Sequence, residues 1–355
     1  MTSSGPRTLL KGNEAAVYGA LLAGCECFFG YPITPASEIA HASAALFPKL
    51  GRVFLQAESE IAAINMVLGS ASAGRRSLTA SSGLGISLKQ EGVSYIATCE
   101  LPCVIIDITR GGPGLGNIGP EQSDYNQLVK GGGHGNYKTI VLAPNSVQEM
   151  CDLTMKAFDL ADKYRTPVYV VADGVIGQMI ESVTLPRAVE GRPVRPDYAI
   201  TAEHGSQANV ITSIYLDHDD LEAVNQRLQD KYAEIQANEQ DAECVDLDDA
   251  DIVLVGYGVS SRIIRTAMAP LQKAGIKVGL LRPRVLWPTP IDALKTAAKH
   301  AKAFVVVEMS NGQFADDVRL AIECSKPVKL CNRMGGNVPT TQQIVEFVTE
   351  LHATL

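Results

Sequence analysis

The stretch LPCVIIDIT, residues 101–109, is apolar at almost every position and decides the fold class. A strand buried on both faces of a parallel sheet has such a continuous apolar run, whereas a half-exposed strand alternates. Further strands are predicted at GRVFLQAE (51–58), RSLTAS (76–81), YKTIVLAP (137–144) and TPVYVVAD (166–173). Segments with helical spacing, at 59–73 and 146–161, lie between them. This succession predicts an α/β fold with a parallel sheet covered by helices.

The pattern is interrupted by Pro186, Pro193 and Pro196 and resumes near residue 250. Between these points a charged helix is predicted at about 219–238, either as a solvated connector or as a docking face. The runs that follow are DIVLVGYG, SSRIIRTAMAPLQKAG, KVGLLRP, IDALKTAAKHA and AFVVVEM, alternately strand and helix. We therefore expect two parallel-sheet domains, at 1–195 and 248–355, joined at 196–247 by a linker that contains the polar helix.

Composition excludes several function classes. The 355 residues are 46% hydrophobic and 20% charged, with a net charge of -8, so a nucleic-acid partner is not expected. No apolar run is long enough to span a membrane and no signal peptide is evident, which predicts a cytoplasmic protein. The eight cysteines contain no C-x-x-C pair. We interpret them as small core residues and expect neither a metal site nor an iron–sulfur cluster in this chain.

Two glycine patterns suggest a dinucleotide site. GLGNIG at 114–119 matches G-x-G-x-x-G but lies between prolines in a long loop, so we reject it. GYGVSS at 256–261 has the strand–turn–helix context, but serine replaces its third glycine and no acidic residue ends the next strand. A tight βα turn is the preferred interpretation, and an NAD(P)-dependent dehydrogenase is kept as an alternative. His134, in KGGGHGNY, is interpreted as a loop residue.

The segment GYPITPASE, residues 30–38, encloses Thr34 between two prolines. Pro35 suits the first position of a helix and Thr34 its N-cap. A helix start with a fixed hydroxyl is either an anion site or simply a well-made helix start.

Two charged residues are the main catalytic and binding candidates. Glu60 begins the helix after strand 51–58, and the apolar residues that follow can draw it into a buried site, which would raise its pKa and let it exchange a proton with a ring nitrogen. Arg110 ends strand 101–109, where ligands of α/β sheets bind, and can hold a carboxylate. The simpler interpretations are a helix-start carboxylate for Glu60 and a loop-binding arginine for Arg110. Thr34, Glu60 and Arg110 all fall at strand ends of one sheet.

Four segments together resemble the alpha subunit of 2-oxoacid:ferredoxin oxidoreductases. They are GYPITPASE, QAESEIAAINMVLGSASAG, TASSGLGISLKQEG and RGGPGLGNIGPEQSDYNQ. The resemblance covers essentially the whole chain and includes YGVSSRIIRTAM and VGLLRPRVLWPTP in the second domain. It is nearest to the branched-chain (3-methyl-2-oxobutanoate) type and similar to the 2-oxoglutarate type. It implies a pyrimidine-type thiamine diphosphate domain followed by a domain like the C-terminal domain of transketolase.

The resemblance also implies roles for single residues. Glu60 would bind N1′ of the thiamine diphosphate aminopyrimidine and promote the imino tautomer, while Thr34 and Arg110 would bind the 2-oxoacid. Tyr31, Pro32 and Ser82 would contact the cofactor. Family members often have serine and threonine after R-G-G-P, whereas this chain has Gly114-Leu115-Gly116, so the polar contacts of this loop differ.

The magnesium half of a thiamine diphosphate site is not evident in this chain. Its usual G-D-G motif is replaced by Ala172-Asp173-Gly174, and no suitable asparagine follows. We therefore expect a beta subunit to supply the Mg²⁺ and diphosphate site and a [4Fe-4S] cluster, with gamma and ferredoxin-like delta subunits also possible. The expected reaction is oxidation of a 2-oxoacid with CoA to acyl-CoA and CO2, with electrons passing to ferredoxin. A non-catalytic assembly subunit is the second alternative.

Overall fold

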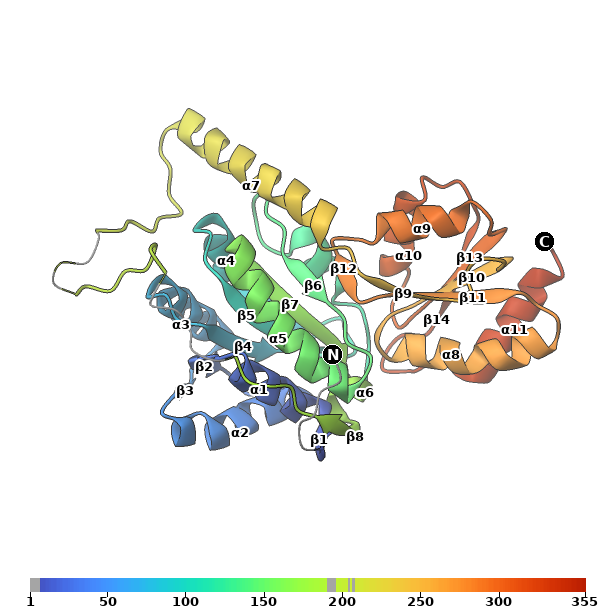
Figure 1. Ribbon diagram of the computed structural model, residues 1–355, viewed down its shortest axis with the longest axis horizontal. Helices are drawn as coiled ribbons and strands as arrows, with labels where there is room; N and C mark the ends of the chain where they lie inside the picture. Colours follow the sequence, from blue (N-terminus) through green and yellow to red (C-terminus); the bar gives the residue numbers. More distant parts are fainter. Residues whose placement is uncertain (1–6, 190–195, 204, 206–207) are drawn as a thin grey trace.

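The structure is a computed structural model that describes residues 7–189, 196–203, 205 and 208–355. Its described part has two main sheets, one in each half of the chain, which lie side by side in Figure 1. The expected α/β class is confirmed.

The first sheet has the strand order β12-β6-β7-β5-β4-β2-β3. Its strands are β2 (Cys27–Gly30), β3 (Val53–Gln56), β4 (Ser77–Ser81), β5 (Cys103–Thr109), β6 (Ile140–Leu142), β7 (Pro167–Asp173) and β12 (Val285–Trp287). All pairings are parallel except that of β12 with β6. Every residue of β5 is buried, as its apolar run predicts for a central strand.

Helices cover both faces of this sheet. They are α1 (Gly12–Leu22), α2 (Ser37–Leu46), α3 (Glu60–Ser72), α4 (Leu84–Thr98), α5 (Val147–Tyr164) and the short α6 (Gly174–Gln178), together with a 3-10 turn (Pro48–Leu50) and a π-helical turn (Gln127–Gly131). Parallel crossovers are right-handed and the chain reverses direction after β3, so α2 and α5 fall on one face and α3 and α4 on the other. This reversal opens a crevice between the carboxyl ends of β2 and β4, the usual ligand position in open α/β sheets.

Smaller elements complete the first half. Strands β1 (Arg7–Lys11) and β8 (Ile180–Thr184) pair antiparallel as a separate ribbon. The predicted polar helix is α7 (His218–Asn238), which runs along the upper edge of the first half toward β12 in Figure 1. One side of α7 is buried through Val224, Leu228, Tyr232 and Ile235, while most of its charged residues stay exposed. It therefore packs on the fold as well as connecting its halves.

The second sheet has the order β14-β13-β10-β11-β9. Its strands are β9 (Ala242–Val245), β10 (Ile252–Val255), β11 (Val278–Pro283), β13 (Ala303–Glu308) and β14 (Val328–Asn332), and its helices are α8 (Gly258–Lys273), α9 (Ile291–Ala298), α10 (Gln313–Ala321) and α11 (Thr341–His352). Only β9 runs antiparallel. Helix α8 packs with α11, and α9 packs with α10.

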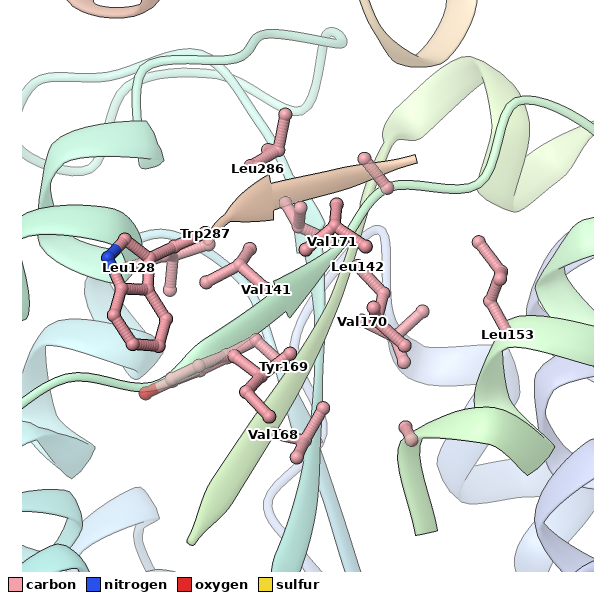
Figure 2. Packing of buried hydrophobic residues seen from close by; sticks show 14 of the residues in the cluster. Leu128, Val141, Leu142, Leu153, Val168, Tyr169, Val170, Val171, Leu286 and Trp287 are labelled. Atoms are coloured by element: carbon pink, nitrogen blue, oxygen red, sulfur yellow. The ribbon is translucent and has the colours of Figure 1, made fainter. Parts of the chain in front are cut away.

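One strand from the second half of the chain belongs to the sheet of the first half. Residues Val285–Trp287, within the predicted second domain, form the edge strand β12 of the first sheet. Figure 2 shows Trp287 of β12 among Leu128 and Val141, so the second half supplies part of the first half's core. The domain boundaries predicted after residues 195 and 247 stay a prediction. Strand β12 belongs to the second predicted domain by its position in the sequence, but it pairs in the sheet of the first.

Two expectations need correction. Thr34 is not the N-cap of α2, because residues 34–36 form a turn and Ala36 occupies the cap position. The Pro35 carbonyl accepts hydrogen bonds from the side chains of Asn13 (2.7 Å) and Gln178 (3.1 Å), so it is bound to other elements than α2. The core interpretation of the cysteines fails for Cys244 and Cys324, which are exposed.

No described helix combines the length and the apolar character needed to cross a bilayer.

The contact between α1 and α5 allows a stability test. A Cβ added at Gly19 would overlap the backbone carbonyl of Cys151 in α5, whereas a Cβ at Gly69 in α3 would meet nothing within 4 Å. We expect Gly19→Ala to lower the free energy of unfolding by about 1–3 kcal/mol, because a helix must shift. Gly69→Ala should raise it by about 0.5–1 kcal/mol, because alanine restricts the unfolded chain. Urea unfolding of both variants is the measurement, and equal effects would contradict the packing.

Candidate active site

The predicted residues lie along one edge of the first sheet. Thr34 follows β2, Glu60 follows β3, Ser82 follows β4 and Arg110 follows β5, so all four are at carboxyl ends of strands. These four strands are adjacent in the sheet. The expected convergence on one sheet edge is therefore present, although the residues fall into two groups with separate contacts.

Glu60 is the first residue of α3, after the cap residue Ser59, whose hydroxyl accepts the N–H of Ala62 (3.1 Å). The Glu60 side chain is buried, at 6% exposure, whereas Glu58 is exposed. The Glu60 carboxylate also lies against the first turn of α4, since a Cβ on Gly85 would be 2.5 Å from its Oε1 atom. The carboxylate therefore lies between the first turns of two helices, α3 and α4.

The approach of α4 to α3 depends on glycine. Gly85, Lys89 and Gly92 share one face of α4 at i, i+4 and i+7, and a Cβ on Gly92 would come within 2.5 Å of Ile64. The segment GISLKQEG therefore carries two glycines that admit α3 and one lysine between them. Lys89 was not predicted as a site residue, although it lies within the segment TASSGLGISLKQEG. The spacing of Gly85, Lys89 and Gly92 is the sequence signal that could have indicated it.

Lys89 is completely buried beside Glu60. Its Nζ atom donates to the Glu60 backbone carbonyl at 3.5 Å. Burial lowers the pKa of Lys89 to about 8, against the opposing attraction of the Glu60 charge. A buried ammonium with one long hydrogen bond is costly, so its place beside the carboxylate suggests a function rather than a packing role.

The Glu60 pocket has unused hydrogen-bonding capacity. The carboxylate accepts one long side-chain bond, from Ser81 Oγ at 3.5 Å, although it has room for several donors. The hydroxyl of Ser82 is buried and has no partner among the described residues. A carboxylate and a hydroxyl left open at a sheet crevice suit an aminopyrimidine ring, whose N1′ can bond to a carboxyl group. Tyr31 and Pro32, directly after β2, are exposed at the same edge.

Arg110 and Thr34 form the second group. The Arg110 guanidinium donates to the Thr34 carbonyl (2.8 Å) and to the Leu115 carbonyl (3.0 Å). Arg110 therefore ties the loop after β2 to its own glycine loop, which is the structural interpretation given above. It remains half-buried and lines a cleft, so its position also allows ligand binding.

This cleft, of about 890 Å³, lies between the two halves of the chain. Its lining residues are Gly83, Leu84, Ser87, Arg110, Gly111, Gly112, Pro113, Gly114, Glu121, Ser123 and Asp124 from the first half, and Ser310, Asn311, Gln313, Met334 and Gly335 from the second. Arg110 is the only cationic residue in this described lining, beside two acidic ones. The second half was not expected to contribute to the site.

Glu121 joins the two walls of the cleft. Its carboxylate accepts the backbone N–H of Gly112 (2.7 Å) and that of Gly335 (2.8 Å). Asn117 adds a bond to the Gly335 carbonyl (3.0 Å), and Gly119 packs so tightly on Gly336 that a Cβ would be 2.8 Å from its Cα. The GLGNIG segment is accordingly a compact loop held by the second half, and no helix starts within it.

The GYGVSS turn is also occupied by a side chain of the protein itself, that of Asp173. Asp173 Oδ2 accepts the Val259 N–H at the start of α8 (2.8 Å), and a Cβ on Gly258 would collide with the same carboxylate. A dinucleotide pyrophosphate would need the helix N-terminus that this carboxylate occupies. The structure therefore gives no room for the dehydrogenase alternative at this turn.

His134 is an exposed loop residue, as predicted, and it lies edge-on to Tyr95. Among the described residues no three His, Cys, Asp or Glu side chains come together as a metal site.

The fold and this sheet edge define an α/β subunit with a ligand crevice where the strand order reverses. The family model "Pyruvate flavodoxin/ferredoxin oxidoreductase, thiamine diP-bdg" matches residues 18–246, and "Pyruvate:ferredoxin oxidoreductase core domain II" matches residues 250–344. The chain belongs to the 2-oxoacid:ferredoxin oxidoreductase family. The resemblance seen in the sequence is thereby confirmed.

Curated relatives and solved structures support this family assignment. The ketoisovalerate oxidoreductase subunit VorB of Methanothermobacter marburgensis is 56% identical over 97% of each chain. The 2-oxoglutarate synthase subunit KorA of Archaeoglobus fulgidus is 40% identical over 89% of this chain and 92% of its own. The structure of 2-oxoglutarate:ferredoxin oxidoreductase from Magnetococcus marinus, with 2-oxoglutarate, coenzyme A and succinyl-CoA bound, is 29% identical with a TM-score of 0.85, over 97% of this chain and 65% of that one.

A more distant likeness concerns the fold alone. A split-gene transketolase, described as an inactive beta4 tetramer, has a TM-score of 0.57 at 12% identity, over 96% of both chains.

Lys89 gives a test of the buried charge. Because its native pKa of about 8 lies below the unfolded value of about 10.4, burial of the ammonium costs stability below pH 8, and this cost disappears as pH rises from 8 to 10. We expect Lys89→Met to raise the free energy of unfolding at pH 7 by about 3 kcal/mol. The gain should vanish near pH 10. Urea unfolding at both pH values is the measurement, and a variant less stable than wild type at pH 7 would contradict the account.

Proposed function

We propose that this chain is the pyrimidine-side subunit of a heteromeric enzyme that oxidises a branched-chain 2-oxoacid with CoA to acyl-CoA and CO2, passing the electrons to ferredoxin. The observation that carries the proposal is the buried Glu60 carboxylate at the first turns of α3 and α4, with open bonding capacity in the sheet crevice. The name of the 56% identical relative, a ketoisovalerate oxidoreductase subunit, supports the substrate class.

Glu60 is assigned the proton-handling role. Thiamine diphosphate, when bound, supplies a nucleophilic thiazolium carbon that attacks the 2-oxo group. Glu60 would hold a proton at N1′ of the aminopyrimidine and exchange it during turnover. The carboxylate lies at the first turns of α3 and α4, and Lys89 donates to the Glu60 backbone carbonyl, which would hold this residue in place before the cofactor arrives. Ser82, with its free buried hydroxyl, is assigned a contact with the same ring. Tyr31 and Pro32 would border it at the crevice edge.

Arg110 and Thr34 are assigned to the substrate. The guanidinium would pair with the 2-oxoacid carboxylate, and its bonds to the Thr34 and Leu115 carbonyls fix where it points. The cleft lining favours an apolar substrate tail, because Leu84, Pro113 and Met334 line it. A second carboxylate, as in 2-oxoglutarate, would have to lie beside Glu121 and Asp124 without a second cation from the described lining.

A beta subunit is proposed to cover the Glu60 side of the sheet. Large apolar side chains are exposed there on three elements: Val53 and Leu55 on the edge strand β3, Ile61 on α3 and Leu88 on α4. Exposed apolar residues around a half-built site suit a protein partner. We assign the Mg²⁺ and diphosphate ligands and the [4Fe-4S] cluster to that partner. Gamma and ferredoxin-like delta subunits would complete the enzyme.

Replacement of Glu60 tests the proposal. Glu60→Gln keeps the shape and the hydrogen bond but cannot exchange a proton, so the assembled enzyme should lose about 10²–10⁴-fold in turnover. The measurement is 2-oxoacid- and CoA-dependent reduction of ferredoxin or a viologen dye, with assembly checked by size-exclusion chromatography.

The matched control is Glu58→Gln, which changes an exposed carboxylate two residues away and should leave turnover close to wild type. Normal turnover of an assembled Glu60→Gln enzyme would make this chain an assembly subunit instead.

Replacement of Arg110 tests the substrate role. Arg110→Ala removes a charge-assisted bond of roughly 1.5–3 kcal/mol and should lower kcat/KM for the 2-oxoacid about ten- to a hundredfold. The KM for CoA should change little. Steady-state kinetics with each substrate varied in turn is the measurement, and an unchanged kcat/KM for the 2-oxoacid would leave Arg110 with its loop-binding role alone.

A further inference from the structure

The turn that begins α4 lies between the two groups of site residues described above. Gly83 is the N-cap residue of α4, with a φ of 45° and a ψ of -107°, a conformation that suits glycine. A Cβ built on Gly83 would lie 3.9 Å from Arg110 Cγ, and one built on Gly85 would lie 2.5 Å from Glu60 Oε1. This turn, residues 82–85, therefore adjoins the pocket assigned to the cofactor on one side and the arginine assigned to the substrate on the other.

A buried carboxylate, that of Asp124, holds this turn through its backbone. The Asp124 Oδ2 atom accepts the Gly83 N–H at 3.1 Å. In a capping box, a glutamate or glutamine side chain in the first helical turn binds this N–H group, but α4 has no acidic residue there. Asp124 therefore supplies, from 41 positions away in the sequence, a bond that is usually local.

Asp124 is itself oriented by a second side chain. Its Oδ1 atom accepts the side-chain amide of Gln127 at 3.0 Å, and the carbonyl oxygen of that amide accepts the Ser87 hydroxyl at 3.1 Å. Gln127 opens the π-helical turn, a rare geometry that occurs frequently at functional sites. Because Ser87 lies on α4 one turn after Gly83, the hydrogen bonds form a closed ring from α4 through Asp124 and Gln127 back to α4.

A simpler role for Asp124 would be that of a counter-ion for Arg110, since both residues line the cleft. The Arg110 guanidinium, however, donates to the Thr34 and Leu115 carbonyls. Both carboxyl oxygens of Asp124 accept other donors, the Gly83 N–H and the side-chain amide described above. The hydrogen bonds of Asp124 therefore mark it as an anchor for the turn.

We propose that Asp124 is a positioning residue that anchors the turn at Gly83 and thereby sets the spacing between the Glu60 pocket and Arg110. The anchor is a property of the chain itself, whereas its effect on turnover rests on the proposed function. Loss of the bond would release the start of α4, where Gly85 packs against Glu60 Oε1, and the backbone beside Arg110. The proton-handling carboxylate and the substrate-binding guanidinium would then both lose a fixed neighbour.

Two replacements of Asp124 separate the anchor from the charge. Asp124→Ala removes both, whereas Asp124→Asn loses the charge but keeps an oxygen that can accept the Gly83 N–H. The first readout is amide hydrogen exchange of the full chain, measured by mass spectrometry on a peptide that covers residues 82–88. Exchange should be about tenfold faster in Asp124→Ala, because a hydrogen bond to a charged group is worth roughly that factor or more, and close to wild type in Asp124→Asn.

A peptide from the start of α8, residues 258–264, is the internal control and should exchange at the wild-type rate in every variant. A wild-type rate for the 82–88 peptide in Asp124→Ala would overturn the anchor, and so would an equal acceleration of both peptides, which indicates general destabilisation. Gln127→Ala is the second variant if Asp124→Ala does not fold. It removes the amide that orients Asp124 and should accelerate the 82–88 peptide by a smaller factor. An unchanged rate in this variant would overturn the closed ring of bonds.

Kinetics of the assembled enzyme test the effect on the site. Asp124→Ala should lower kcat and raise KM for the 2-oxoacid, with a combined loss of about tenfold in kcat/KM, because one turn adjoins both Glu60 and Arg110. Asp124→Asn should recover most of this loss. Equal impairment of the two variants, with normal hydrogen exchange in Asp124→Asn, would overturn the positioning role, because a charge effect treats them alike. Absence of all 2-oxoacid turnover in the wild-type enzyme would instead reject the proposed function, and hydrogen exchange would then decide the anchor alone.

Discussion

A single buried carboxylate, Asp173, determines how the two halves of this chain meet. It ends β7, caps α6 through the N–H groups of Val175 and Ile176, and accepts the N–H of Val259 at the start of α8. Three backbone donors are what a buried carboxylate needs, although burial still raises the pKa of Asp173. Because this side chain also closes the start of α8, the second half cannot slide along the first without breaking the Val259 bond and leaving that N–H and Asp173 Oδ2 unpaired.

Further contacts between the two halves fix the position of the cleft walls. Gln122 donates to the Tyr257 carbonyl and accepts the Met309 N–H, and Glu121, its neighbour, binds both Gly112 and Gly335. The strand β12 completes the first sheet from the other half of the chain. The loop that carries Arg110 is therefore held by residues more than 200 positions away in sequence. The second half lines one wall of the cleft and therefore sets its geometry.

The sequence predicted the elements that repeat a pattern and missed those that depend on contacts between distant residues. Strands such as β5 and β7 and helices such as α3 and α8 follow from apolar periodicity, and Glu60, Thr34 and Arg110 follow from the rule that sites lie at carboxyl strand ends. Thr34 was misjudged as a cap because the Pro35 carbonyl binds Asn13 and Gln178, which no local pattern reveals. Lys89 and Glu121 lie on a helix and a loop that give no sign of burial or partner. Their contacts are revealed only by the packing of α4 on α3 and of the Gly335 loop on the first half.

Three anions near the site are compensated in different ways. The Glu60 carboxylate lies near the buried Lys89 ammonium, the Asp124 carboxylate accepts the Gly83 N–H and the Gln127 side-chain amide, and the Glu121 carboxylate accepts two backbone N–H groups and the Ser123 hydroxyl. Arg110 is the cation of the described cleft lining. Its guanidinium donates to the Thr34 and Leu115 carbonyls, and no carboxylate of the described residues is bound to it. An incoming carboxylate is then the group that this arrangement lacks, because every other charge at the cleft wall already has its counterpart within the fold.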